Sequence, residues 1–262
     1  MNVKRIAPLA TLGAALLLFA AEPAAAQSTS AEAINGLNER LLVVAIPITV
    51  LVEGILIYTV LKFKDSDEAK PTRENRRLEI TWTIATAVIL LFVGIATTMV
   101  MADQSVIVDD VENRADVPED AEHVNVEAYR YGWDFEYTEH NVSSGGKLVI
   151  PEGQETYFNI TTRDWLHAFH VPQLGLKHDA VPGQHNYLMT TATEPGLYQG
   201  YCAEYCGTGH SGMMFEVEVM PQDEYEAWLA EQCDGEWNSE ELTCEGGAGG
   251  SNSSTSNATV AA

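Results

Sequence analysis

The residues best suited to chemistry lie close together between positions 202 and 213. Cys202 and Cys206 are followed by His210 and Met213, immediately before an apolar run that begins at Met214 and is typical of a strand. Two thiolates, an imidazole and a thioether form a soft ligand set that favours copper. The short spacing of the cysteines by itself also permits a disulfide or a zinc site.

A copper site on this segment can be mononuclear or dinuclear. A mononuclear blue-copper site uses one Cys, two His and a weak Met, so one of the two cysteines would be surplus. Two thiolates on one loop can instead bridge two copper ions, and each ion then needs one further imidazole. His210 supplies one of them. The other must come from elsewhere in the chain.

The second imidazole has several upstream candidates. His167 stands in the segment Asp-Trp-Leu-His, just beyond a strand-like run at 156–161, and His170 is only three residues further on, so spacing does not exclude it. We interpret the other upstream histidines as surface or hydrogen-bonded residues: His123, His140, His178 and His185.

Two further cysteines lie near the C-terminus. Cys233 and Cys244 would close a short loop, and an extracytoplasmic, oxidising compartment favours a disulfide between them. The sequence contains no Cys-x-x-Cys-His motif, so we expect no c-type haem attached to this chain.

The elements that must position these residues begin with two long apolar runs, at about 41–61 and 80–101, each long enough to span a membrane. The connection, residues 62–79, is rich in Lys and Arg and is therefore expected in the cytoplasm, which puts the rest of the chain outside. Residues 1–26 are typical of a signal peptide, with an uncleaved anchor as the alternative. We expect residues 27–104 to form the anchor in the cell membrane.

The C-terminal half has a different texture. Short β-rich segments, at 124–137, 147–150, 156–161, 187–191 and 214–219, are separated by Gly and Pro turns, which favours a small antiparallel sandwich or barrel over 105–232. Tyr225, Trp228 and Leu229 indicate one short helix in the stretch beginning at Pro221. Residues 233–262 are expected to be an acidic to Gly/Ser-rich tail, partly disordered.

The net charge of −24 is confined to this half, since residues 1–101 carry equal numbers of acids and bases. Such an acidic surface excludes nucleic acid as a partner and indicates either cationic partners or a salt-rich host.

The cysteine segment resembles a known family. It matches Cys-x-Glu-x-Cys-Gly-x-x-His-x-x-Met without a gap, and His167 matches a His preceded by Asp-x-x and followed by Val-Pro. Together with the two-helix anchor, these motifs resemble subunit II of the cytochrome c oxidases over about residues 35–232. The resemblance implies a transmembrane hairpin followed by an all-β, cupredoxin-like Greek-key sandwich or barrel.

The resemblance also implies a dinuclear copper centre, CuA. Both cysteine sulfurs would bridge the ions, with His167 and Met213 completing one ion, and His210 and the Glu204 main-chain carbonyl the other. The Glu204 side chain would reach a magnesium ion shared with subunit I. Electrons would come from cytochrome c or a small blue-copper protein and pass to haem in subunit I, where oxygen is reduced, so no catalytic residue is expected on this chain. Subunit III and membrane lipid are further expected partners.

Three other positions carry expectations from the resemblance. Glu79 matches a carboxylate at the mouth of a proton pathway, or is simply an interfacial charge. Trp133 matches the second of two Trp residues near the electron entry, although core packing is the simpler interpretation. The first is replaced by Tyr131, a departure that puts the usual docking route in doubt and leans towards a blue-copper donor.

Competing classes make different demands on the sequence. A quinol oxidase subunit II has the same anchor but lacks the copper ligands. A membrane-tethered copper store or chaperone would need an exposed, exchangeable site. Nitrous oxide reductase shares CuA but carries a large His-rich catalytic domain, for which a chain of 262 residues with this layout has no room.

Overall fold

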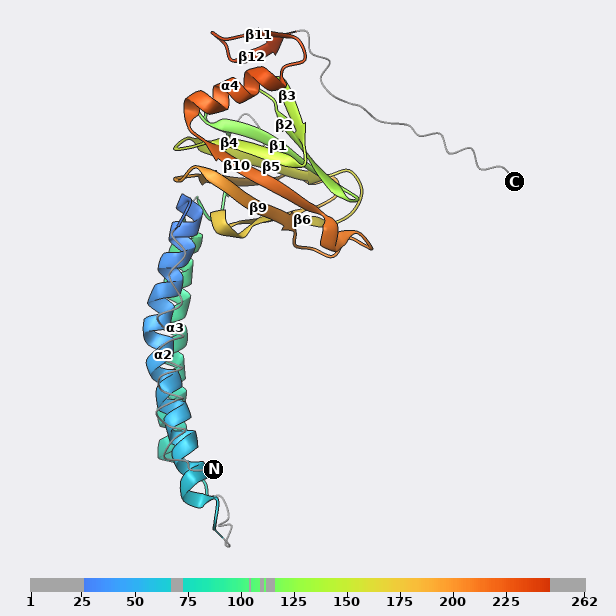
Figure 1. Cartoon of the computed structure of the whole chain (residues 1–262). Coiled ribbons are helices and arrows are strands. Elements are labelled where there is room, and N and C mark those ends of the chain that lie inside the picture. The colour runs from blue at the N-terminus through green and yellow to red at the C-terminus, as the bar shows by residue number, and fades with distance from the viewer. Residues whose placement is uncertain (1–25, 67–72, 104, 109–110, 112–115, 246–262) are drawn as a thin grey trace, which may run out of the picture.

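A helical hairpin carries a β-sandwich at one end (Figure 1). The computed structural model describes residues 26–66, 73–103, 105–108, 111 and 116–245. The expected signal peptide, apart from Ala26, and the expected disorder of residues 246–262 therefore lie outside the described residues. Within them, the expected fold class is confirmed: two apolar helices precede an all-β, cupredoxin-like sandwich.

The hairpin consists of α2 (Thr29–Phe63) and α3 (Arg76–Met101), both long and apolar enough to cross a membrane. α2 begins well before the apolar run, because the Ser28 side chain caps the helix by accepting from the Ala31 N–H at 3.1 Å. Thirty-five residues make a helix of about 50 Å, which exceeds the roughly 30 Å of hydrocarbon. The first turns of α2 therefore reach out of the membrane to the sandwich.

The start of α2 is joined directly to the sandwich. The Ser28 hydroxyl donates to the Leu174 carbonyl at 2.6 Å, and Ser28 and Ala31 are buried. Gly175 has a φ of +66°, and a Cβ there would lie 2.8 Å from the Ala31 nitrogen. Glycine is thus needed for both its backbone conformation and its lack of a side chain. This close approach holds the β domain on the end of the hairpin.

The sandwich has two five-stranded sheets, with parallel pairs β1–β5 and β4–β10 and otherwise antiparallel neighbours. The first sheet has the order β3 (Val142–Gly145), β2 (Gly132–Tyr137), β1 (Glu122–Tyr129), β5 (Glu155–Thr162), β8 (Asn186–Thr191). The second has the order β4 (Lys147–Pro151), β10 (Met214–Met220), β9 (Gly196–Cys202), β6 (His167–Val171), β7 (Leu176–Ala180). The 3-10 turns η2 (Pro172–Leu174) and η3 (His210–Gly212) lie in connections.

An aromatic core joins the sheets. Phe135, Phe158, Phe169 and Phe215 are buried, and the rings of Phe169 and Phe215 stack with centroids 5.0 Å apart. Each buried ring of this size contributes about 1.5–3 kcal/mol through the water it excludes. This core fixes the two sheets against each other and so fixes the loops at their ends.

The sequence expectation differs from the fold in several strands. The run 124–137 is a hairpin rather than one segment, because the chain reverses at Arg130–Tyr131 and Tyr129 pairs with Gly132. The strands β3, β6, β7 and β9 were not anticipated, since their residues mix Gly, His and other polar types with apolar ones. Their strand character comes from the neighbours they pair with, a tertiary effect.

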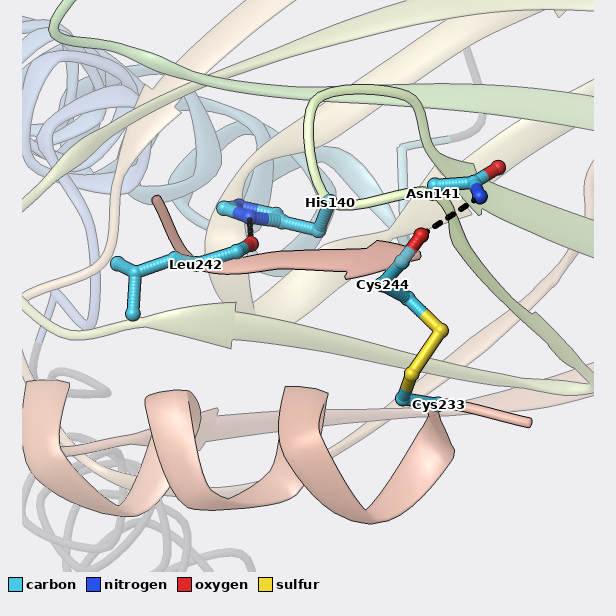
Figure 2. The surroundings of a disulfide bond; sticks show 5 residues. All are labelled: His140, Asn141, Cys233, Leu242 and Cys244. Atoms are coloured by element: carbon cyan, nitrogen blue, oxygen red, sulfur yellow. Dashed lines mark hydrogen bonds between the residues drawn. A yellow bond between two sulfur atoms is a disulfide. The ribbon is translucent and has the colours of Figure 1, made fainter. Parts of the chain in front are cut away.

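Up to Glu245, the C-terminal region forms regular structure instead of the tail expected from residue 233 onward. α4 (Gln222–Gln232) buries Tyr225 and Leu229, as expected, and is followed by a small hairpin of β11 (Glu236–Asn238) and β12 (Thr243–Glu245). A disulfide joins Cys233 to Cys244, with Cα atoms 5.4 Å apart. Figure 2 shows this disulfide beside His140 and Asn141, which bond to the hairpin backbone.

Candidate metal centre

The candidate site is a loop closed at both ends by paired strands. Cys202 is the last residue of β9, and Met213 immediately precedes β10, the antiparallel neighbour of β9. The Cys202 N–H donates to the Met213 carbonyl at 3.0 Å. The ten residues between them leave and return at the same end of this strand pair. Two ligand-type residues distant by eleven positions are thereby placed side by side.

The loop turns its sulfur atoms inward. Cys206 is 1% exposed and Met213 is fully buried, and their sulfur atoms are 3.8 Å apart. The loop tightens where the His210 N–H donates to the Gly207 carbonyl at 3.1 Å. His210 Nδ1 lies 3.7 Å from the Cys206 sulfur. The loop alone therefore gathers two thiols, an imidazole and a thioether.

His167 reaches the loop from the next strand. It is the first residue of β6, which pairs with β9 through Phe169 opposite Cys202. Its Nδ1 lies 3.7 Å from the Cys202 sulfur, and the side chain is fully buried. Nitrogen and sulfur atoms of His167, Cys202 and Cys206 all lie within 4.8 Å of one another, a spacing that could hold a metal ion.

His170 points elsewhere. Its Nδ1 lies 2.8 Å from the Leu176 carbonyl, and its ring meets the Tyr201 ring edge-on at 5.0 Å. Since alternate strand residues face opposite sides, positions three apart in β6 cannot share a face. The two histidines that spacing left open thus have different surroundings, and only His167 faces the sulfurs.

Asp164 orients the His167 ring. The Nε2–H of His167 donates to Asp164 Oδ1 at 3.0 Å, which leaves the Nδ1 lone pair free towards Cys202. The same carboxylate accepts from the main-chain N–H of Arg130 at 2.8 Å and of Trp165 at 2.6 Å. Burial raises the pKa of Asp164, but the hydrogen bonds from His167 and these two amides outweigh it, so the pKa is lowered. The carboxylate is thus held ionised as a fixed support.

The two thiols are close but not bonded. Their sulfurs are 3.9 Å apart, and both cysteines are free. Burial and the neighbouring Cys202 raise the pKa of Cys206 to about 11. A metal ion would replace the thiol protons and stabilise the charge that burial disfavours. Two buried, unbonded thiols ringed by two imidazoles and a thioether fit a soft metal, copper above all.

Glu204 offers two different groups. Its main-chain carbonyl oxygen lies 3.1 Å from the Cys202 sulfur, within the ring of donor atoms, while its side chain is exposed. A carbonyl oxygen at this point is available to a metal held by the thiols. The side chain is exposed and so is accessible to a group outside this chain.

The two aromatic residues of the expected electron entry lie differently. Trp133 is 1% exposed and packs edge-on to His167 at 6.3 Å, so it belongs to the core and offers no surface to a partner. Tyr131 is 41% exposed and packs from the β1–β2 turn against the ligand loop. A Cβ on Gly209 would come within 2.5 Å of the Tyr131 ring, and one on Gly207 within 2.6 Å of its hydroxyl.

No role was expected for Trp165 or Arg130, and Asp164 entered only as part of the Asp-x-x motif before His167. The signal available was an Asp-Trp pair two and three residues before His167. Its meaning depends on the turn between β1 and β2, which brings Arg130 over the Trp165 ring, 4.6 Å from the centroid. Glu79 lies exposed in the first turn of α3, at the other end of the molecule.

Comparison with known proteins gives one family. The chain joins a two-helix hairpin to a cupredoxin-like domain with a cluster of Cys, His and Met side chains. The model of the cytochrome c oxidase subunit II transmembrane domain matches residues 20–100, and that of its periplasmic domain matches residues 135–220. The chain belongs to the cytochrome c oxidase subunit II family. It is a membrane protein whose β domain lies on the extracytoplasmic side.

Individual relatives carry the same name. Cytochrome c oxidase subunit 2 of Alkalihalophilus pseudofirmus is 31% identical over 189 residues, which cover 70% of this chain and 53% of that relative. A probable cytochrome c oxidase subunit 2 of Rickettsia bellii is 27% identical over 222 residues, covering 76% of this chain and 79% of the relative. The chain thus spans about half the length of the first relative and about four fifths of the second.

Among solved structures, the periplasmic domain of subunit II of cytochrome oxidase from Bradyrhizobium japonicum aligns with a TM-score of 0.42 at 24% identity. The alignment covers 44% of this chain and 96% of that one. A chain of a haem-copper terminal oxidase dimer aligns with a TM-score of 0.40 at 22% identity, covering 55% of this chain and all of that one.

Proposed function

We propose that this chain is the electron-entry subunit of a respiratory haem-copper oxidase. It would receive electrons one at a time from an external carrier and deliver them to haem in subunit I, where oxygen is reduced to water. The observation that carries the proposal is the convergence of six donor groups on one buried point: the sulfurs of Cys202, Cys206 and Met213, Nδ1 of His167 and His210, and the Glu204 carbonyl.

These residues would hold a dinuclear copper centre, with both thiolates shared between the ions. When bound, such a centre supplies one-electron transfer with little change in its ligands. The chain's own contribution is to keep the ligands in place. β9 and β10 clamp the loop at both ends, Asp164 fixes the His167 ring, and burial of Cys206 and Met213 keeps water away from the sulfurs.

Other parts of the proposal concern residues outside the copper ligands. The exposed Glu204 carboxylate would hold a magnesium ion together with subunit I, and Glu79 would stand at the entrance of a proton pathway in subunit I. Subunit III and membrane lipid would contact the hairpin, whose apolar side chains are exposed along its length. The carrier would be cytochrome c or a small blue-copper protein.

The test uses the full chain in its purified oxidase complex. Metal analysis is expected to give two copper ions for this chain beyond those of subunit I, and the paramagnetic resonance spectrum should show hyperfine structure shared over two copper nuclei. Met213→Leu should perturb that spectrum, whereas Met214→Leu should not, because Met213 is fully buried at the sulfurs and Met214 is 51% exposed. The hyperfine pattern of a single copper would contradict the proposal.

A further inference from the structure

We propose that the outer end of the membrane hairpin carries a binding site for one phospholipid molecule with an ethanolamine headgroup. Arg40 of α2 holds the lipid phosphate, and the carboxylate of Asp103, which follows α3, holds the ammonium group. The site lies apart from the candidate metal centre and involves none of its ligands.

An open cavity of about 760 Å³ lies where the hairpin meets the β domain. Its walls come from α2, the end of α3 and the strands β5 and β8, so elements far apart in the chain contribute to it. Figure 1 shows the outer ends of both helices directly below the sandwich. Ligand pockets have volumes of roughly 300–1,000 Å³. The cavity is thus large enough for a lipid headgroup and the beginning of its acyl chains.

The cavity lies at the height of the lipid headgroups. Arg40 immediately precedes the apolar run of α2, which begins at Leu41, and Asp103 lies two residues beyond Met101, where α3 ends. Both residues therefore mark the outer boundary of the hydrocarbon region. On the membrane side, the cavity is lined by Met99, which is 66% exposed. A charged cavity with an apolar lower wall at this depth matches a phospholipid rather than a soluble metabolite.

Arg40 supplies the positive charge of the cavity. It is the only Lys or Arg between residues 27 and 61, and the ion pairs among the described residues do not include it. Lys and Arg beside membrane helices usually lie on the cytoplasmic side, so the position of Arg40 does not serve the orientation of the hairpin. A guanidinium binds a phosphate through two parallel hydrogen bonds. A lipid phosphate at this depth is a suitable partner for it.

Three carboxylates line the same cavity, those of Glu32, Asp103 and Glu155. Asp103 is held in place, because the Ser105 N–H and hydroxyl both donate to its Oδ1, at 3.0 and 2.8 Å. These two bonds leave Oδ2 for a ligand. With three acids and one base, the cavity favours a headgroup that carries a positive group beside its phosphate, and it disfavours a purely anionic headgroup. An ethanolamine ammonium donates hydrogen bonds to carboxylates, whereas the quaternary ammonium of choline has no N–H to donate.

Gly36 keeps the cavity open. It lies one turn before Arg40 on the same face of α2, and a Cβ at this position would meet no atom within 4 Å. A larger side chain would therefore enter the cavity without a clash at its Cβ. Gly54 also has nothing within 4 Å of its Cβ position, but it lies eighteen residues further along the same helix, about 27 Å away. The two glycines are a matched pair for a test.

The first measurement is the lipid content of the purified oxidase complex, determined by native mass spectrometry after a detergent wash that removes bulk lipid. Gly36→Leu should retain one phosphatidylethanolamine molecule fewer than the unmodified complex, and Gly54→Leu should retain the same number as the unmodified complex. An unchanged number in Gly36→Leu, or an equal loss in both variants, would overturn the inference. Loss of a subunit instead of a lipid from Gly36→Leu would assign the cavity to a protein interface and also overturn it.

The second measurement is headgroup selectivity, which does not require a change at Gly36. The lipid-depleted complex is titrated with short-chain phosphatidylethanolamine, phosphatidylcholine and phosphatidylglycerol. Phosphatidylethanolamine should bind about tenfold more tightly than the other two, and Arg40→Gln should weaken its binding about tenfold, because charged hydrogen bonds are lost. Asp103→Asn should remove the preference over phosphatidylcholine. Glu39→Gln is the matched control, since Glu39 is exposed on the same helix end but does not line the cavity, and it should keep the preference.

The outcomes of this titration are separable from the proposed function. Equal affinities for the three lipids, or tighter binding of phosphatidylglycerol, would overturn the inference. The same holds if Arg40→Gln binds phosphatidylethanolamine as tightly as the unmodified complex. The paramagnetic spectrum of each variant reports on the copper centre independently, and it should be unchanged in all of them.

Discussion

The two cysteine pairs of this chain use the same side chain for different ends. Cys202 and Cys206, four residues apart, keep their sulfurs 3.9 Å apart and unbonded. Cys233 and Cys244, eleven residues apart, form a disulfide. The first pair lies at the end of the sandwich that gathers metal-type ligands, and the second fastens the C-terminal hairpin. Spacing alone therefore does not decide what two cysteines do.

The surroundings of each cysteine pair decide whether it binds a metal or forms a disulfide. The first pair shares a buried point with two imidazoles and a thioether, so a metal can satisfy both sulfurs at once. Near the second pair, hydrogen bonds attach the C-terminal hairpin to the β domain. The Cys244 N–H donates to the His140 carbonyl at 2.9 Å, and Asn141 donates to the Cys244 carbonyl at 2.9 Å (Figure 2). Cross-linking here restrains the chain and serves no ligand.

The largest expected effect comes from exchanging one sulfur of the first pair. Cys206→Ser should abolish the shared-copper spectrum and carrier oxidation, because only the Cys202 thiolate would remain of the two that the proposal shares between the ions. The matched control is the double variant Cys233→Ser with Cys244→Ser, which should keep the spectrum. Paramagnetic resonance of the purified complex distinguishes them. A paired signal that survives in Cys206→Ser would refute the bridging assignment.

The next effect separates the two histidines of β6. His167→Asn should reduce copper affinity about 100-fold or more, since even removal of a group that merely supports a ligand costs 10–100-fold. His170→Asn should leave affinity within about twofold, because its ring contacts Leu176 and Tyr201 rather than sulfur. Competition with a copper chelator measures both. Unchanged copper affinity in His167→Asn would show that the imidazole facing the Cys202 sulfur is not a ligand.

A smaller effect is expected from the second cysteine pair. The Cys233→Ser, Cys244→Ser variant should lose about 3 kcal/mol of stability in the β domain, the value typical of a loop of this size, without any change in copper content. Thermal unfolding of the metal-free complex, followed in parallel for Cys206→Ser, measures the difference. If the disulfide variant also loses copper, the two ends of the domain are coupled and the two cysteine pairs do not act independently.

The smallest effect concerns the pH dependence of the stability that the His140 hydrogen bonds give to the C-terminal hairpin. His140 donates from Nε2 to Glu122 at 3.0 Å and from Nδ1 to the Leu242 carbonyl at 2.6 Å, and the ring of Tyr225 packs edge-on to it. Burial lowers the pKa of His140, but the hydrogen bond and charge of Glu122 and the Leu242 carbonyl outweigh it and raise the pKa.

Because the folded pKa lies above the unfolded value of about 6.5, this stabilisation is complete below that value and is lost as pH rises through the folded pKa. We expect a loss of about 1 kcal/mol, measured by denaturant unfolding across this range. His140→Gln should flatten this part of the pH profile. The same slope in both proteins would exclude His140 as its source.

Much of the site could be predicted from the sequence because its donors are local. Cys202, Cys206, His210 and Met213 lie within twelve residues, so their order and spacing alone indicate a soft metal site. The membrane hairpin was equally predictable, since its signal is composition over a long run. Strands such as β6 and β9 were missed because their sequences carry no clear alternation, and pairing with neighbours makes them strands.

By itself, the sequence determined the ligand loop, the two apolar helices and the acidic half of the chain, all of which follow from residue types over short stretches. Spacing left His167 and His170 open, and only the resemblance favoured His167; the tertiary structure turns His167 towards the sulfurs, because it lies on the face of β6 that meets the ligand loop. It buried Trp133, as the simpler interpretation of the sequence expected, and it alone left Trp165 exposed beneath Arg130. Contacts between residues far apart in the chain are set by how the two sheets pack, and no local pattern encodes them.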